Sequence, residues 1–247
     1  MRNFRAIFRK QLKDTFKNVA TLVNFIVFPA VAFAMSFIVV TDFGEEIPAE
    51  IAQMLAANMP NMVLMMAAMF AGMGLIPAVA GMIAEDIEKK SLRFLTMAGV
   101  KPPAYLLGVG GVTFLLGIVT SAAFGLIAEF SGRAFWIFLA SMLSGVAASI
   151  VLGAAIGIFC KNQQAATGLS MPFAMILGFG PMMAQFNDSI ARGMHVFYTQ
   201  QLNVIADYLT HGVSENPLWQ AFAIMWANVA VLGVLFAVVY RKKGLKG

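Results

Sequence analysis

Six long apolar runs dominate the sequence, and each is long enough to cross a lipid bilayer. A bilayer-spanning helix needs roughly 20 predominantly apolar residues. The runs are Thr21–Val40, Met62–Ala84, Ala104–Ala128, Ala134–Phe159, Ala165–Ala184 and Trp219–Tyr240. The pattern predicts an all-α membrane protein with six transmembrane helices in one domain, residues 1–247.

Residues 1–20 carry a different pattern, in which apolar and basic side chains occupy opposite sides of a helix. The apolar positions at helical spacing are Phe4, Ile7, Phe8, Leu12, Phe16 and Val19. Such a segment is typical of an amphipathic helix in the membrane interface. It either anchors the topology or offers a contact surface to a cytoplasmic partner.

The connection between the second and third runs, "AEDIEKKSLRFLTMAGVKPP", holds seven charged residues. We expect a short helix from Glu85 to Val100. Acidic residues lead and basic residues follow, an order that suits the helix macrodipole: Glu85, Asp86, Glu88, Lys89, Lys90 and Arg93. Apolar residues then follow in Leu92, Phe94, Leu95 and Met97. A loop that only fixed topology would need neither acids nor an apolar patch, so residues 85–101 are predicted to dock on a partner.

The third and fourth runs contain small residues four positions apart. The fourth run has Ser141, Gly145, Ser149, Gly153 and Gly157, and the third has Gly117, Ser121 and Gly125. Small residues at this spacing let helix backbones approach closely inside a membrane. We expect packing within one subunit, with a subunit interface as the alternative. The short connection predicts that the two runs form a hairpin.

Two further features bear on a substrate path and on the outer surface. The second run is rich in methionine, notably at Met62, Met65, Met66, Met69 and Met73. Methionine adapts to irregular apolar partners, so these residues either pack and face lipid or line an apolar path. Residues 185–218 contain apolar clusters that predict short extracytoplasmic helices rather than a free loop. Pro172 and Pro181 are expected to bend the fifth run or its exit.

Composition and charge agree with this membrane assignment. The chain is 60% hydrophobic and 12% charged, with a mean hydropathy of +0.80, which excludes an ordinary soluble domain. Fifteen of the 17 Lys and Arg residues fall on one side of the six runs, whereas the other side has Arg133 and Arg192. Because cytoplasmic loops are enriched in Lys and Arg, both termini are expected in the cytoplasm of a cell-membrane protein. The net charge of +5 is therefore attributed to a membrane surface and not to nucleic acid. The single cysteine, Cys160, excludes an internal disulfide.

The sequence lacks the motifs of an energy-converting or catalytic site. It has no G-x-x-x-x-G-K-[ST] loop and no H-E-x-x-H motif, and its two histidines, His195 and His211, lie in the outer segment. Ser144 is conceivable as a nucleophile, but no histidine faces it at membrane depth. The runs hold almost no ionisable residues of the kind that ion-coupled transporters use. We therefore expect no catalysis, metal or cofactor in this chain.

The segment "IAEDIEKKSLRFLTMAGVKPPAYLLG" resembles the first cytoplasmic loop of permease subunits of type-2 ATP-binding-cassette (ABC) exporters. Ser91-Leu92-Arg93-Phe94-Leu95 occupies the place of the T-L-x-x-L core of those loops, and Lys90 stands where a glycine is common. The basic N-terminal helix, the six runs, "PFAMILGFGP" and the outer helices extend the resemblance over the whole chain.

The resemblance implies that the chain is a permease that dimerises, as a homodimer or with a related permease. It also implies docking on a separate ATPase subunit that binds ATP and Mg²⁺. The coupling residues would be Glu85, Asp86, Glu88, Leu92, Arg93 and Leu95. The expected function is export of an amphiphilic drug, a peptide antibiotic or a lipid-like molecule. The alternatives are export of a polysaccharide or lipid-linked glycan, and a membrane scaffold or sensor that transports nothing.

Overall fold

The computed structural model describes residues 2–17, 19–41, 49–212 and 217–244, and these residues form helices and short turns without strands. The all-α prediction is therefore confirmed. In chain order the helices are α1 (Arg2–Lys17), α2 (Val19–Thr41), α3 (Ala49–Met69), the π-helix η1 (Phe70–Gly74), α4 (Leu75–Glu88), α5 (Ser91–Met97), α6 (Pro102–Ile127), α7 (Gly132–Gly157), α8 (Gln163–Ala184), α9 (Asp188–Met194), α10 (Tyr198–His211) and α11 (Leu218–Gly244).

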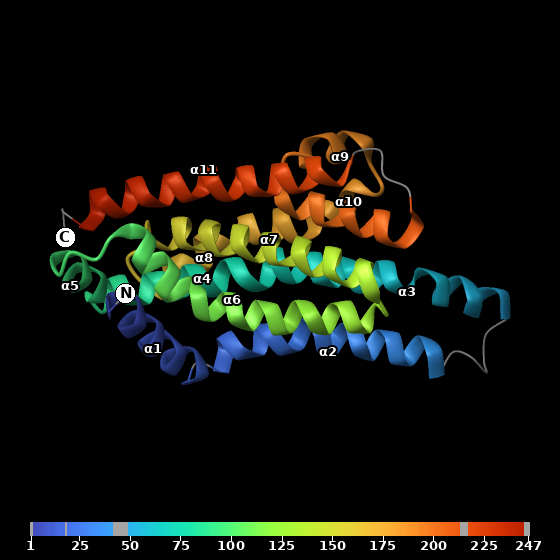
Figure 1. The fold of residues 1–247 in the computed structure, drawn as a ribbon, viewed down its shortest axis with the longest axis horizontal. Coiled ribbons are helices and arrows are strands. Elements are labelled where there is room, and N and C mark those ends of the chain that lie inside the picture. Colours follow the sequence, from blue (N-terminus) through green and yellow to red (C-terminus); the bar gives the residue numbers. More distant parts are fainter. Residues whose placement is uncertain (1, 18, 42–48, 213–216, 245–247) are drawn as a thin grey trace.

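The long helices form an elongated bundle, as Figure 1 shows. The N-terminal helix α1, the short helix α5 and the end of α11 lie together at one end, and α9 and α10 lie toward the other (Figure 1). Most described basic residues belong to the first of these ends, which we call the basic end. The described exceptions are Arg133, at the α6–α7 turn, and Arg192, on α9.

Five helical stretches among the described residues are long and apolar enough to cross a membrane. They are Asn58–Glu88, Pro102–Ile127, Gly132–Gly157, Gln163–Ala184 and Leu218–Lys242. Helix α2 contributes a shorter apolar stretch, Leu22–Ile38, whose 17 residues lie at the lower limit of about 17–25 for a transmembrane helix. The sixth expected span is thus an apolar helix of marginal length, and the other five agree in place with the sequence pattern. Pro172 and Pro181 lie inside one uninterrupted helix, α8.

The prediction of one short helix from Glu85 to Val100 is wrong. The second apolar run continues as helix through Glu88, so the three acidic residues form the last turn of α4 and not the start of a separate helix. Lys89 and Lys90 make the turn, and only Ser91–Met97 forms α5. The helix continues because Glu85 and Asp86 find partners on neighbouring helices, which offsets their unfavourable place at a helix C-terminus.

Helix α7 is the centre of the bundle and packs against α4, α6, α8, α10 and α11. The largest core side chains include Phe70, Leu75, Phe124 and Met142, which are almost completely buried. By contrast, α2, α8 and α11 bury narrow stripes and expose large apolar side chains on their remaining surface. In a membrane, these exposed surfaces face lipid or another protein.

Helix α1 packs along α6 instead of standing apart from the bundle. Ile7 is buried, and a Cβ added at Gly108 would come within 2.5 Å of its Cγ2 atom. Phe8 and Leu12 are half-buried, whereas Phe16 is exposed. The predicted apolar face is therefore only partly the packing face. The side chains of Phe4 and Val19 lie outside the described residues.

Candidate functional site

Helix α5 is a seven-residue helix within the connection between α4 and α6, at the basic end of the bundle. It begins after Lys90, whose backbone is left-handed (φ 58°, ψ 11°), and it ends before a turn at Gly99 (φ 75°). Glycine adopts such a backbone without strain, whereas a side chain at Cβ makes it costly. A glycine in place of Lys90 would therefore adopt this backbone geometry with less strain than lysine does.

The two faces of α5 differ in exposure. Leu92 is 5% exposed and Val100, after the helix, is also buried in the core. Phe94 and Met97 are 67% and 73% exposed. Of the predicted coupling residues, Leu92 therefore faces the bundle, Leu95 is half-buried and Arg93 faces outward. The exposed apolar surface of α5 is made by Phe94 and Met97. The predicted coupling residues had instead included Leu92 and Leu95.

The three acidic residues on the last turn of α4 have different surroundings. Glu85 forms an ion pair with Lys89 and accepts a 2.7 Å hydrogen bond from Gln163 Nε2 of α8. The hydrogen bond between Lys89 and Glu85, together with the negative charge of Glu85, raises the pKa of Lys89. Asp86 is buried. Glu88 is exposed and accepts a 3.3 Å bond from the backbone N–H of Gln163.

Asp86 joins three helices that are far apart in the sequence. Lys10 of α1 lies 2.5 Å from its Oδ1 atom, and the Tyr105 hydroxyl of α6 donates to Oδ2 over 2.9 Å. We call these three residues the Asp86 cluster. The Tyr105 ring also contacts the ring of Tyr240 of α11 in a tilted arrangement, with centroids 5.4 Å apart. The Tyr240 hydroxyl donates to the Val100 carbonyl over 3.2 Å, so the cluster is connected to the turn that follows α5.

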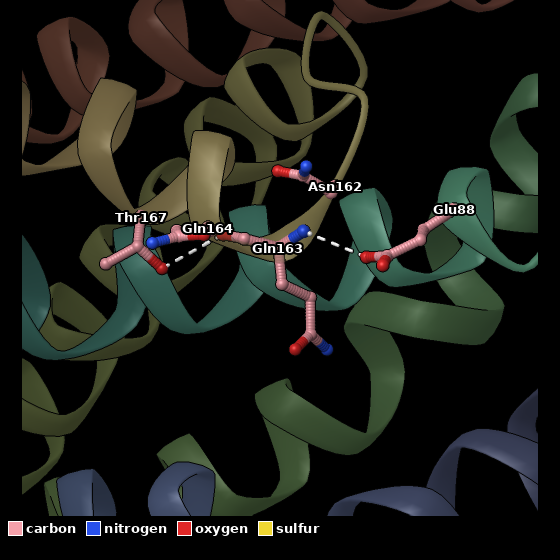
Figure 2. A pocket seen from close by; sticks show the side chains of 5 residues that line it. All are labelled: Glu88, Asn162, Gln163, Gln164 and Thr167. Atoms are coloured by element: carbon pink, nitrogen blue, oxygen red, sulfur yellow. Dashed lines mark hydrogen bonds between the residues drawn. The ribbon is translucent and has the colours of Figure 1, made fainter.

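A polar pocket of about 420 Å³ lies between the end of α4 and the start of α8. Figure 2 shows the five residues that line it: Glu88, Asn162, Gln163, Gln164 and Thr167. The Asn162 side chain caps α8 by accepting a 2.8 Å bond from the Ala165 N–H. The Thr167 hydroxyl donates to the Gln163 carbonyl over 3.1 Å (Figure 2). The pocket is thus lined by one carboxylate, three side-chain amides and a hydroxyl, and the amides and the hydroxyl both donate and accept hydrogen bonds.

The small residues of α7 lie in direct contact with other helices of the same chain. A Cβ at Gly153 would come within 2.7 Å of the Ile76 carbonyl oxygen, and one at Gly157 within 2.5 Å of the Ala80 carbonyl oxygen. Gly145 lies against Leu202 of α10, and Ser141 is buried. These contacts leave no room for side chains, so this stripe packs inside the subunit.

Ser149, in the same stripe, is the centre of a neutral polar group. Its Oγ lies 2.7 Å from the carbonyl oxygen of Ala71 in η1, 2.9 Å from that of Gly145 and 2.9 Å from the Tyr198 hydroxyl of α10. Carbonyls only accept, so Ser149 donates to a carbonyl and Tyr198 donates to Ser149. We call Ala71, Ser149 and Tyr198 the Ser149 cluster.

The five methionines proposed for a substrate path share one environment. Each is half-buried, at helical spacing along α3 and η1: Met62, Met65, Met66, Met69 and Met73. Met73 lies against Gly178 of α8, where a Cβ would come within 2.3 Å of its Cγ atom. Nearby, Gly72 and Gly178 allow the two backbones to cross closely. The methionines therefore lie at the edge of the core, neither buried nor fully exposed.

The sequence did not single out Lys10 as a partner of Asp86, nor Tyr105, Gln163 and Tyr240. No local pattern could reveal them, because 76 residues separate Lys10 from Asp86. Within the described part of the chain, no group of three or more His, Cys, Asp and Glu side chains is placed to hold a metal ion.

Comparison with known protein families identifies a family to which the chain is similar. The family model described as ABC-2 family transporter protein matches residues 49–238, which is well over half of the chain and includes every helix from α3 to α10 and most of α11. Helices α1 and α2 precede the matched residues. No curated protein matches the sequence.

Proposed function

The chain belongs to the ABC-2 family of transporter proteins, and on that premise we propose that it exports an amphiphilic or hydrophobic molecule. Members of this family are permease subunits of ABC transporters, so the chain is a membrane protein that works with an ABC ATPase subunit. ATP and Mg²⁺ are bound by that partner, since this sequence has no phosphate-binding G-x-x-x-x-G-K-[ST] loop.

Helix α5 is the docking element for the ATPase, and the observation that carries this proposal is the exposure of Phe94 and Met97. Both side chains project from a helix that lies outside the candidate spans, at the basic end of the bundle. Exposed apolar groups at such a position favour a protein partner that removes them from water. Arg93 and Lys90 border this surface and supply charges that orient the partner.

A force applied to α5 would reach the membrane helices through short, packed connections. Leu92 is anchored in the core, and Val100 is held both by burial and by the hydrogen bond from Tyr240. Tyr240 in turn contacts Tyr105 of the Asp86 cluster. The ends of α1, α4, α6 and α11 would therefore move together with α5, which is how ATP hydrolysis outside the membrane could rearrange the spans.

The substrate class follows from the methionine stripe of α3 and η1. Its members are half-buried at helical spacing, and methionine adapts to apolar molecules of varied shape. This supports an apolar path suited to a drug, a peptide antibiotic or a lipid-like molecule. A glycan would need polar and aromatic groups along the path, and the stripe has neither, so glycan export is the less favoured alternative.

The basic end is proposed to face the cytoplasm, with both termini, because basic residues are enriched on that side of a membrane. A second permease copy would complete the transporter, as a homodimer or a heterodimer. A cysteine at Lys90 should resist an impermeant thiol reagent in intact cells, and a cysteine at Arg133 should react. The opposite labelling pattern would reverse the orientation.

The docking proposal is tested with the double variant Phe94→Asp/Met97→Asp in lipid nanodiscs. The probe is the ATP-hydrolysing subunit that is isolated with the wild-type chain from native membranes. Interface anchors contribute about 1–4 kcal/mol each, so binding of the ATPase should weaken by roughly a hundredfold or more. ATP hydrolysis by the complex should no longer respond to the permease.

The matched control is Phe186→Asp, which changes a side chain that is 77% exposed beyond the other end of α8. Substitution of Leu92 is not a suitable test, because a charge there would disturb the core. Normal ATPase binding by the Phe94/Met97 variant would show that α5 is only a connection. Failure of the wild-type chain to bind any ATPase would favour the scaffold or sensor alternative.

A further inference from the structure

The pocket between α4 and α8 differs in charge from the rest of the basic end. The connections at the basic end carry exposed basic residues: Lys89, Lys90, Arg93, Lys101 and Lys161. Its own lining has one ionised group, the carboxylate of Glu88, and otherwise amides and a hydroxyl (Figure 2). Because the lining holds a carboxylate and no basic side chain, the pocket itself is better suited to a cationic group than to an anion.

The Glu88 carboxylate makes fewer interactions than the carboxylate of Glu85, which lies about one turn earlier on α4. Glu85 has an ion pair with Lys89 and a hydrogen bond from the Gln163 side chain. Among the described side chains Glu88 has no ion pair, and its single hydrogen bond comes from the Gln163 backbone at 3.3 Å, near the limit for such bonds. The carboxylate therefore retains most of its capacity to accept hydrogen bonds from a partner.

We propose that this pocket receives an arginine or lysine side chain of the ATPase subunit. The inference rests on the proposed docking at α5, because Glu88 lies three residues before the first residue of α5 and at the same end of the bundle. The lining offers the Glu88 carboxylate, side-chain amide oxygens and the lone pairs of Thr167. A guanidinium group, with five N–H donors in a fixed plane, matches this set of acceptors best.

The pocket and α5 would then have separate tasks in one interface. Phe94 and Met97 provide apolar adhesion, whereas Glu88 fixes the register of the ATPase on the permease. A charge pair at the rim of an interface mainly affects the association rate and the salt dependence of that rate. A charge pair enclosed within the interface mainly affects the dissociation rate.

The test compares Glu88→Gln with wild type for binding of the isolated ATPase subunit to the full permease in nanodiscs. Glutamine keeps the shape and can still accept the Gln163 N–H, so only the charge is lost. The dissociation constant should rise by roughly tenfold, and its dependence on salt concentration should decrease. Glu129→Gln, an exposed carboxylate at the α6–α7 turn, is the matched control and should bind as wild type.

A second variant locates the charge on the partner. The Glu88→Lys permease should bind the ATPase more weakly than the Glu88→Gln permease does. Replacing the basic residue of the ATPase by glutamate should restore binding only to the Glu88→Lys permease. If Glu88 only caps α8, Glu88→Gln will lower thermal stability and leave ATPase binding and its salt dependence unchanged, and the pocket proposal is then wrong. That result leaves docking through α5 intact, whereas loss of ATPase binding by the wild-type chain would remove both.

Discussion

The Asp86 cluster and the Ser149 cluster each join three helices, but the first does so with charged groups and the second with neutral ones. Asp86 connects α4 to Lys10 of α1 and Tyr105 of α6. Ser149 connects α7 to the Ala71 carbonyl of η1 and to Tyr198 of α10. Both clusters pair polar groups that would be costly to bury alone.

The difference follows from their depth in the bundle. Asp86 lies on the last turn of α4 at the basic end, where the Lys10 side chain remains 45% exposed and keeps part of its hydration. Ala71 lies near the middle of the span Asn58–Glu88, where a charge would be far more costly. The charged cluster therefore lies near α5, the proposed docking element, and the neutral cluster lies near the middle of a span.

The largest effect is expected from Asp86→Ala, which tests the charged cluster. The substitution leaves the buried Tyr105 hydroxyl without its acceptor and removes the attraction to Lys10. We expect a loss of about 3 kcal/mol of stability. Cys160 is buried and is the single cysteine of the chain, so its reaction with a fluorescent maleimide during heating reports unfolding in detergent.

Asp86→Asn is the matched control for that experiment, because its amide oxygen still accepts from Tyr105 while the charge is lost. It should lose about half as much stability as Asp86→Ala. Equal melting temperatures for wild type and Asp86→Ala would mean that the cluster does not hold α1, α4 and α6 together.

Ser149→Ala should have an intermediate effect, about 1–2 kcal/mol, because hydrogen bonds between membrane helices contribute modestly. Tyr198→Phe removes one end of the same chain of hydrogen bonds and should cost less. The double variant should cost hardly more than Ser149→Ala alone, since both changes break one unit. Additive losses in the same thermal assay would show that the two hydroxyls act independently. Changing salt concentration should alter the effect of Asp86→Ala but not that of Ser149→Ala.

The smallest effect is expected at the turn that connects the Asp86 cluster to α5. Lys90→Gly removes the side chain from a left-handed backbone (φ 58°) and should stabilise the folded chain by about 0.5–1 kcal/mol. Lys90→Ala keeps the Cβ and removes the charge, so it should give no gain. A gain with alanine that equals the gain with glycine would indicate that charge repulsion, and not the backbone, is relieved.

Much of the fold could be predicted from the sequence because the bilayer imposes a simple rule on apolar length. Five of the six predicted spans are matched by helices of sufficient length, and the sixth by the shorter apolar stretch Leu22–Ile38 of α2. The end of the second span was misplaced, because polar residues such as Glu85 and Asp86 continue a helix when neighbouring helices satisfy them. The hydrophobicity of the sequence alone cannot show that such residues have hydrogen-bond or ion-pair partners on neighbouring helices.

The sequence pointed to the connection between the second and third spans as the candidate site, but not to the arrangement of its residues. Of the helix predicted from Glu85 to Val100, only Ser91–Met97 forms a separate helix, α5, and the sequence could not tell which side of it faces outward. Over seven residues, Ser91–Met97, apolar side chains occur on both sides, and periodicity does not separate Leu92 from Phe94.

By itself, the sequence determined the apolar spans, the charge difference between the two ends and the small-residue stripe of α7. Each is a property of composition or of local spacing. Only the tertiary structure decided that Lys10 pairs with Asp86, that Ser149 reaches Ala71 and Tyr198, and that Glu88 lines a pocket with the start of α8. These contacts join residues tens of positions apart. Which residues meet depends on how whole helices pack, and no local sequence pattern encodes that packing.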